Sequence, residues 1–106
     1  MWVDRRRGVG MILLDGPEHA AEVLKIVFSL RRARVSAAFI CDPGRSLKSM
    51  MREADRSNFL DVMVLGEQEF RDKKFKVKDM EDGSVEEFDL EKIVDVLIER
   101  NSYEIG

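Results

Sequence analysis

The chain has 106 residues, with 18 lysines and arginines against 21 aspartates and glutamates, a formal net charge of −3 and an isoelectric point near 5.2. This length suits one domain, and we expect no catalytic domain beside a recognition domain. A hydrophobic fraction of 44% favours a folded chain. No apolar run approaches the roughly 20 residues of a membrane-spanning helix, and no secretory signal is recognisable, so we expect a cytoplasmic protein without a membrane partner.

Cysteine and histidine each occur once, as Cys41 and His19. An intramolecular disulfide and a zinc site made only of cysteine and histidine are therefore excluded. Asp15 and Asp42 lie near these two residues in the sequence, but no third partner occurs at a supporting spacing. We accordingly expect a reducing environment, no metal, no cofactor and no catalytic residues.

Charge is unevenly distributed along the chain. Residues 1–58 carry a net charge of +4 and residues 59–106 a net charge of −7. The acidic total argues against a dedicated nucleic-acid-binding protein, whose usual feature is a basic domain or face, and we expect no DNA partner. A local basic surface in the first half remains compatible with the total.

The first half of the chain alternates between apolar runs of strand length and amphipathic segments. Strands are predicted at Gly10–Leu14 and Val35–Cys41, and a helix over residues 17–33. The turn residues Asp42–Gly44 end the second strand, and Ser46 is a suitable cap for another helix. Two consecutive strand-helix-strand units indicate parallel strands with helices packed on the sheet.

The second predicted helix separates apolar from basic positions. Its core stripe consists of Leu47, Met50, Met51 and Ala54, and its basic residues are Arg45, Lys48, Arg52 and Arg56. At about 100° per residue, the four basic positions fall within an arc of about 80°. They form either a ridge that follows a nucleic-acid backbone or a solvated face that Glu53 and Asp55 partly neutralise.

The second half of the chain predicts a third strand at Leu60–Gly66. The acidic residues that follow, Glu67, Glu69 and Asp72, could hold a cation or accept hydrogen bonds from bases, but a solvated loop is the alternative that we favour. Residues 74–78 alternate with period two, Asp82–Gly83 indicates a hairpin turn, and residues 84–88 return as the partner strand. Asp89 can cap a last helix. The fold class is therefore α/β, with a mixed five-stranded sheet of a parallel core plus an antiparallel hairpin, and three helices. We expect tails at residues 1–9 and 102–106 around a domain of residues 10–101.

Three lysines alternate along the first strand of the predicted hairpin. Lys74, Lys76 and Lys78 share one face of this strand, while Phe75 and Val77 share the other. The lysines could contact RNA phosphates, but pairing with Glu86 and Glu87 on the partner strand is an alternative that we favour.

Several segments resemble the C-terminal anticodon-binding domain of class II histidyl-tRNA synthetases, in the same order and at similar spacing. They are Gly44-Arg45-Ser46-Leu47-Lys48, Ala54-Asp55, Val64-Leu65-Gly66-Glu67 with Glu69, and Val77-Lys78-Asp79-Met80 followed by Asp82-Gly83. The resemblance covers roughly residues 10 to 100. One departure lies in the second helix, where Met50 stands in place of the family's usual glutamine.

The resemblance implies a non-catalytic module that binds the anticodon stem-loop of a tRNA, since the class II catalytic motifs do not occur in the sequence. Arg45, Ser46, Lys48 and Arg52 would meet phosphates, and Glu67 and Glu69 would hydrogen-bond to unstacked bases. The alternative is a free-standing paralogue that acts in dimerisation or regulation without binding RNA. Its partner would be a second copy or a synthetase catalytic domain.

Overall fold

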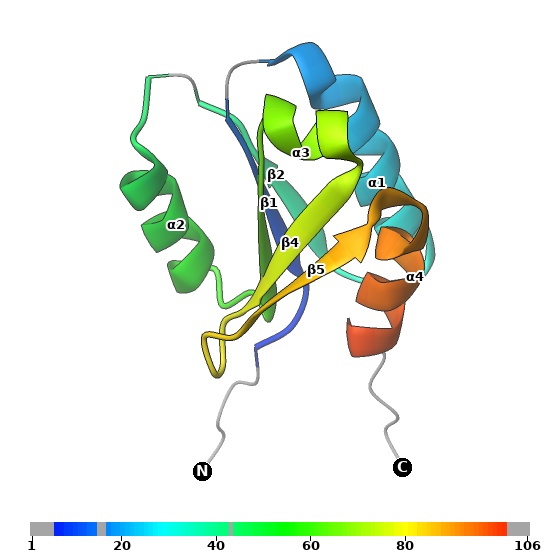
Figure 1. Ribbon diagram of the computed structural model, residues 1–106. Helices are drawn as coiled ribbons and strands as arrows, with labels where there is room; N and C mark the ends of the chain where they lie inside the picture. Colours follow the sequence, from blue (N-terminus) through cyan, green and yellow to red (C-terminus); the bar gives the residue numbers. More distant parts are fainter. Residues whose placement is uncertain (1–5, 15–16, 43, 102–106) are drawn as a thin grey trace, which may run out of the picture.

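Five strands and four α-helices follow one another in the computed structural model, which describes residues 6–14, 17–42 and 44–101 (Figure 1). They are β1 (Val9–Leu13), α1 (Ala20–Arg32) after a 3₁₀ turn at Pro17–His19, β2 (Ala37–Ile40), α2 (Leu47–Arg56), β3 (Asp61–Leu65), α3 (Glu67–Asp72), β4 (Lys74–Asp79), β5 (Val85–Asp89) and α4 (Leu90–Asn101). Residues 1–5 of the expected first tail and the whole expected tail 102–106 lie outside the described residues. No described helix has the length and apolar character needed to cross a bilayer.

The strands form one mixed sheet in the order β2-β1-β3-β4-β5. β1 pairs in parallel with both β2 and β3, in registers that place Val9 beside Ala37 and Asp61. β4 is antiparallel to β3 and to β5. This arrangement confirms the predicted α/β class, with a parallel core and an added hairpin.

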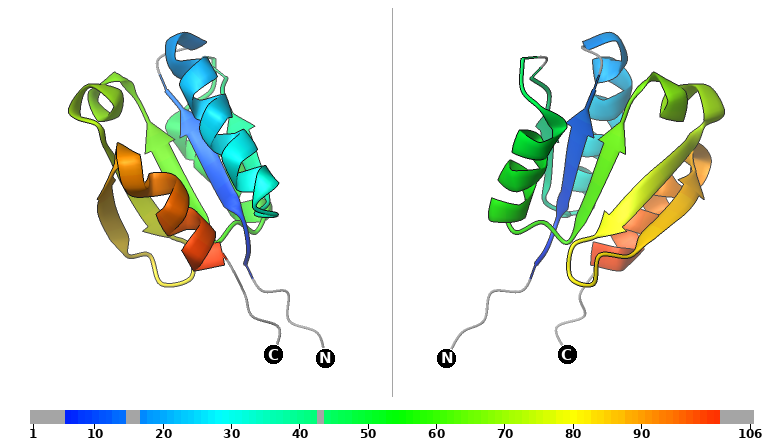
Figure 2. Two further views of the ribbon diagram at one scale, coloured as in Figure 1. Left: turned by 90° about the vertical axis from the view of Figure 1, so that its right-hand side faces the viewer. Right: turned by 60° about the vertical axis from the view of Figure 1, so that its left-hand side comes forward.

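The two faces of the sheet are covered unequally. On one face, α1 and α4 bury the larger core, which includes Met11, Met63 and Phe75 at 0% exposure. On the other face, α2 packs Met50 and Ala54 against Ile12 and neighbouring side chains. Figure 2 shows that α2 lies over the β1 and β2 side, so β4 and β5 carry no helix on this face.

α3 differs from the expected loop after β3. Its first turn is closed by the Glu69 carboxylate, whose Oε1 accepts a hydrogen bond from the Gly66 backbone N–H at 2.7 Å. Phe70 supplies the apolar anchor and is only 8% exposed. A six-residue segment with one buried side chain shows no readable periodicity, which is why the prediction contained three helices instead of four.

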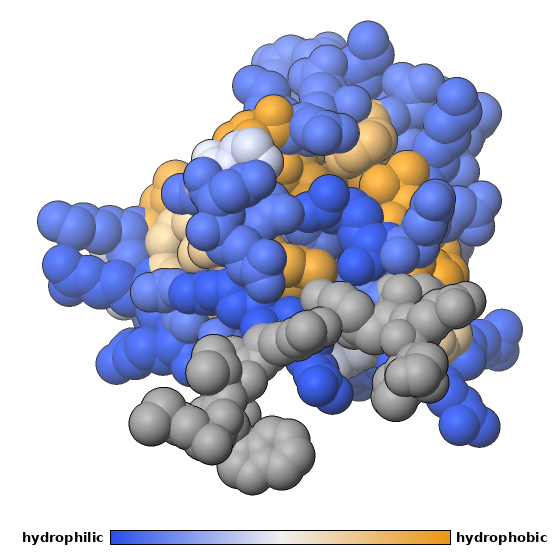
Figure 3. Space-filling view, turned by 90° about the horizontal axis from the view of Figure 1, so that it is seen from below, coloured by the Kyte–Doolittle hydropathy of each residue, from blue (hydrophilic) through white to orange (hydrophobic). Residues whose placement is uncertain are grey.

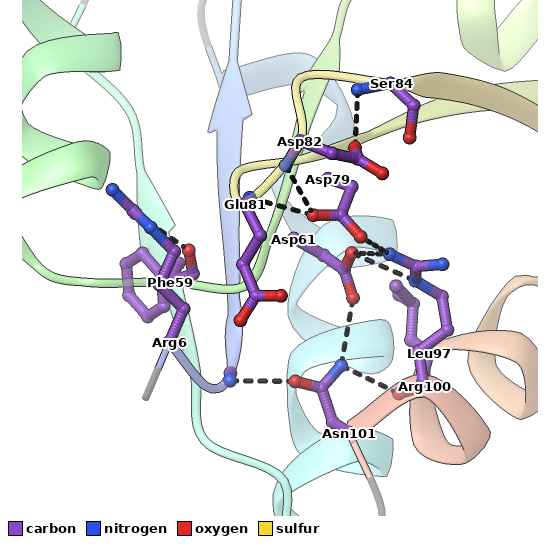
Figure 4. Close-up of polar contacts among 11 residues, drawn as sticks. Arg6, Phe59, Asp61, Asp79, Glu81, Asp82, Ser84, Leu97, Arg100 and Asn101 are labelled. Carbon is purple, nitrogen blue, oxygen red and sulfur yellow. Dashed lines mark hydrogen bonds and ion pairs between the residues drawn. The ribbon is translucent and has the colours of Figure 1, made fainter. Parts of the chain in front are cut away.

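A buried polar network holds the end of the molecule where β1, β2 and β3 begin, called the lower end below (Figures 1 and 4). Asp61 is fully buried and its Oδ1 accepts hydrogen bonds from Nε and Nη2 of Arg100, at 3.0 and 2.7 Å. Arg100 also donates to Asp79 at 2.8 Å, and Asn101 joins Asp61 to the backbone N–H of Gly8. The network therefore ties the starts of β1 and β3, the end of β4 and the last turn of α4 together.

β2 is an edge strand, and a side chain covers part of its open edge. The Ser36 carbonyl accepts from the Val9 N–H on the β1 side, so the next carbonyl, that of Ala37, points outward. The Arg31 guanidinium donates to this oxygen through two nitrogens, at 2.9 and 3.2 Å. Arg31 comes from the last turn of α1 and so links that helix to the edge of the sheet.

Candidate nucleic-acid interface

The first predicted phosphate ligand, Arg45, precedes the Ser46 cap of α2, and its side chain extends along that helix. Its guanidinium pairs with Glu53 two turns later and donates to the carbonyl and hydroxyl oxygens of Ser49. Glu53 therefore neutralises Arg45, as in the second of the two alternatives given for the basic residues of this segment. Arg45 could meet a phosphate only if the anion competed with Glu53.

The remaining residues predicted on α2 divide into a cap and two exposed cations. Ser46 begins the helix as expected, because its Oγ accepts from the Ser49 N–H at 3.1 Å. Lys48 and Arg52 are exposed and lie one turn apart. No ion pair engages either side chain within the residues that the structure describes. They are therefore available to an anion.

Met50 lies on the inner face of α2. It is 2% exposed and packs in the smaller core with Ile12, Ile40 and Val62. At this position a polar side chain would be buried among apolar ones, so methionine serves the packing of α2 on the sheet.

The half of the sheet that α2 leaves uncovered is hollowed. A cavity of about 320 Å³ lies beside α2, with an apolar floor and charged walls, and its lining residues are Met51, Val62, Val64, Glu69, Lys76, Lys78 and Val85. A second hollow of about 400 Å³ lies against it and shares Glu69 and Lys76. We call this surface the open sheet face. Figure 2 shows its strands from the uncovered side.

The two predicted base-reading carboxylates are separated by the fold. Glu69 is half-buried, lines the open sheet face and closes the first turn of α3. Glu67 is exposed and pairs with Arg71 at 3.1 Å, beside a different hollow that His19 and Phe70 line. Glu69 alone thus remains near the lysines of β4.

The lysines of β4 stand on the open sheet face as the alternation predicts. Phe75 and Val77 are buried on the helix-covered face, whereas Lys76 is exposed and Lys78 is half-buried. In the register with β5, Lys76 stands beside Glu87 and Val77 beside Glu86. Of the two proposed glutamate partners, only Glu87 therefore shares a face with the lysines.

His19 and Cys41, the residues considered for metal or nucleophile chemistry, both pack against apolar side chains. The His19 ring stacks on Phe70 with centroids 4.1 Å apart, and Cys41 is a free thiol packed against the larger core. Among the described residues, no group of three or more histidine, cysteine, aspartate or glutamate side chains could hold a metal ion.

The site thus combines aliphatic surface, ammonium groups and one carboxylate in a shallow hollow. The valines and Met51 offer contact to flat apolar faces, the lysines can contact phosphates, and Glu69 can accept hydrogen bonds from base edges. The apolar floor could not be foreseen from the sequence, because Val62 and Val64 are typical of any buried strand.

Solved structures with this architecture define the class of protein. The chain superposes on apo histidyl-tRNA synthetase of S. aureus with a TM-score of 0.73 and 26% identity, covering 88% of this chain and 24% of that one. The RNA-binding domain of threonyl-tRNA synthetase from Cryptosporidium parvum shares the fold, with a TM-score of 0.71 and 16% identity over 92% of this chain and 24% of that one. The fold is that of a domain carried by tRNA synthetases.

Residues 9–100 match the family model of the anticodon binding domain, and the chain belongs to this family. The histidine–tRNA ligase of Chlorobium limicola is 36% identical over 84 residues, which cover 79% of this chain and 19% of that protein. The ligase of Staphylococcus saprophyticus is 37% identical over 86 residues, 78% of this chain and 20% of that protein. The chain therefore spans about a fifth of the length of these relatives, and the resemblance to the histidyl-tRNA synthetase domain is confirmed.

Proposed function

We propose that this chain binds the anticodon stem-loop of a tRNA, without bond chemistry, and that the loop lies on the open sheet face. The observation that carries the proposal is the hollow in which Glu69, Lys76 and Lys78 surround the apolar side chains of β3. Because the relatives are histidine–tRNA ligases, a histidine tRNA is the first ligand to test.

Each part of this face suits one part of a single-stranded loop. Splayed bases bury their flat faces on apolar side chains, and a carboxylate accepts hydrogen bonds from their amino groups. Lys76 and Lys78 would hold phosphates on the β4 side, and Lys48 and Arg52 on the α2 side. We retain Arg45 as a weaker candidate because Glu53 already occupies its guanidinium, and Ser46 as the residue that positions the helix start.

Salt dependence of binding tests the proposal. Four phosphates engaged on a single-stranded loop predict a slope of log affinity against log salt of about −3. We expect Lys76→Gln with Lys78→Gln to weaken binding about tenfold and to reduce the magnitude of that slope by about 1.4. The measurement is fluorescence anisotropy of labelled stem-loop RNA at several salt concentrations. No binding at any salt would contradict the proposal.

A matched control separates position from total charge. Lys25→Gln with Lys92→Gln removes the same two charges from exposed sites on α1 and α4. This control should bind as the unchanged chain does. Glu69→Gln preserves the oxygen that closes α3 and removes only the negative charge, so it should relax discrimination between loop sequences while leaving the unfolding midpoint nearly unchanged.

A second candidate function is that of an interaction module, and one observation favours it. Leu24 and Phe28 lie one turn apart on α1 and are 36% and 55% exposed. Paired apolar side chains in solvent are typical of surfaces that meet another protein. Light scattering at micromolar concentration tests for a dimer. A monomer that binds the stem-loop would dismiss this candidate, and a dimer without RNA binding would favour it over the first.

A further inference from the structure

Four exposed arginines lie on three different segments at the lower end of the molecule, where α1 and α2 end and β1 begins. This arginine cluster consists of Arg7, Arg32, Arg34 and Arg56. All four are exposed, and within residues 6–14, 17–42 and 44–101 no ion pair or side-chain hydrogen bond engages any of their guanidinium groups. None of the four lines the open sheet face.

The chain path brings the segments that carry the cluster together. The Arg7 N–H donates to the carbonyl of Asn58, two residues after Arg56, at 3.1 Å. The Val9 N–H donates to Ser36 at 2.9 Å, so the residues just before β1 and β2 run side by side. Arg7 therefore lies between the end of α2 and the segment that leads into β2.

Arg34 is held in that segment by its backbone. Its φ of 64° reverses the chain after α1, and its N–H donates to the Arg31 carbonyl at 3.0 Å. Cations at the end of a helix offset the partial negative charge of the last carbonyls, which accounts for Arg32 and Arg56. That account does not extend to Arg7, which precedes a strand, or to Arg34, which follows the cap of its helix.

Three acidic groups at the lower end are already paired. Asp55 pairs with Arg6, and Asp61 and Asp79 both pair with Arg100. The hairpin turn adds exposed acids, Glu81 among them, on the β4 side of this end. Figure 3 looks onto the lower end and shows hydrophilic side chains around most of its rim. The positive charge of the cluster is therefore left without an internal partner among the described side chains.

We propose that the arginine cluster is a second phosphate-binding site, which takes the sugar-phosphate backbone of the RNA stem next to the loop. This proposal rests on the proposed function, because it assumes that the loop lies on the open sheet face. α2 lies beside both surfaces: its ten residues span about 15 Å, Met51 lines the open sheet face, and Arg56 ends the helix at the arginine cluster. Unpaired guanidinium groups suit phosphates, which they can bind through two parallel hydrogen bonds.

Two RNA probes test the proposal with the 106-residue chain. One is a hairpin that contains the anticodon stem and loop, and the other is a single-stranded oligonucleotide with the loop sequence alone. We expect Arg7→Gln with Arg34→Gln to weaken hairpin binding about tenfold and to reduce the magnitude of its salt slope by about 2. Binding of the loop oligonucleotide should stay unchanged. The control Lys25→Gln with Lys92→Gln should alter neither.

Each other outcome overturns the proposal in an identifiable way. Equal losses for the arginine variant and the lysine control would mean that only total charge matters. Equal losses for the hairpin and the loop oligonucleotide would place the arginines at the loop site. If Arg7→Gln with Arg34→Gln leaves hairpin binding unchanged while Lys76→Gln weakens it, the second site is refuted and the proposed function stands. No binding of either RNA by the unchanged chain would refute both.

Discussion

Removal of the Asp61 carboxylate should destabilise the fold more than any change at the exposed charges. Asp61→Ala deletes the acceptor of three hydrogen bonds, two from Arg100 and one from Asn101. Loss of one member of a buried ion pair costs about 3–5 kcal/mol. Arg100 keeps Asp79 and its side chain is 28% exposed, so we expect the lower limit, about 3 kcal/mol.

Urea unfolding followed by circular dichroism measures this loss. With a slope of about 1.5 kcal/mol per molar urea, the midpoint should fall by about 2 M. Glu99→Ala is the matched control, because Glu99 is exposed and adjoins Arg100 in α4. The control should change the free energy of unfolding by less than about 0.5 kcal/mol.

A double variant tests the mechanism of the loss. Asp61→Ala with Arg100→Met removes both charges, so its cost should be clearly smaller than the sum of the two single costs. Additive losses, or a loss below about 1 kcal/mol for Asp61→Ala alone, would refute the role assigned to this ion pair.

Three further changes follow from the backbone and the hairpin turn. Gly10→Ala should cost about 1–3 kcal/mol, because its Cβ would lie 2.7 Å from Cδ2 of Phe59; adding Phe59→Leu should recover part of the loss in urea unfolding. Lys73→Gly should raise the free energy of unfolding by about 0.5–1 kcal/mol, since Lys73 has a φ of 55°; a loss would contradict the strain argument. Hydrogen bonds from the side chain and then the backbone of Ser84 hold the pKa of Asp82 below its usual 3.8. The folded state then binds fewer protons, so Asp82→Asn should lower the unfolding midpoint at about pH 6, and the difference should vanish as the pH falls through the lowered pKa; a constant difference down to about pH 2 would contradict this.

The three parallel strands could be predicted from continuous apolar runs, and β4 and the three longer helices because their side chains repeat with a clear period. Residues 74–78 alternate between charged and apolar types, and the structure places Phe75 and Val77 in the larger core while Lys76 stays exposed. α3 could not be predicted in this way, because Phe70 is its only buried side chain. Its first turn depends on the Glu69 side chain folding back to Gly66, and sequence spacing only permits that contact.

The candidate site could be predicted only in part, because a position on a helix face does not determine where a long side chain ends. Arg45 and Arg52 fall on the same arc of the predicted helix, yet Arg45 precedes α2 and pairs with Glu53 while Arg52 stays exposed. Glu67 and Glu69 are two residues apart and project to different surfaces. The open sheet face depends on how much of the sheet α2 covers, and that is decided by tertiary packing.

The contact between Arg31 and the Ala37 carbonyl has a consequence for how this domain behaves at high concentration. An uncovered edge strand with apolar residues can recruit the edge of another molecule and begin an extended sheet, which is a common route to aggregation. β2 is short, and the guanidinium of Arg31 occupies an outward acceptor that an incoming strand would need. The same arginine adds a positive charge, so two such edges repel each other at close approach. The last turn of α1 thereby disfavours pairing between the β2 edges of two copies.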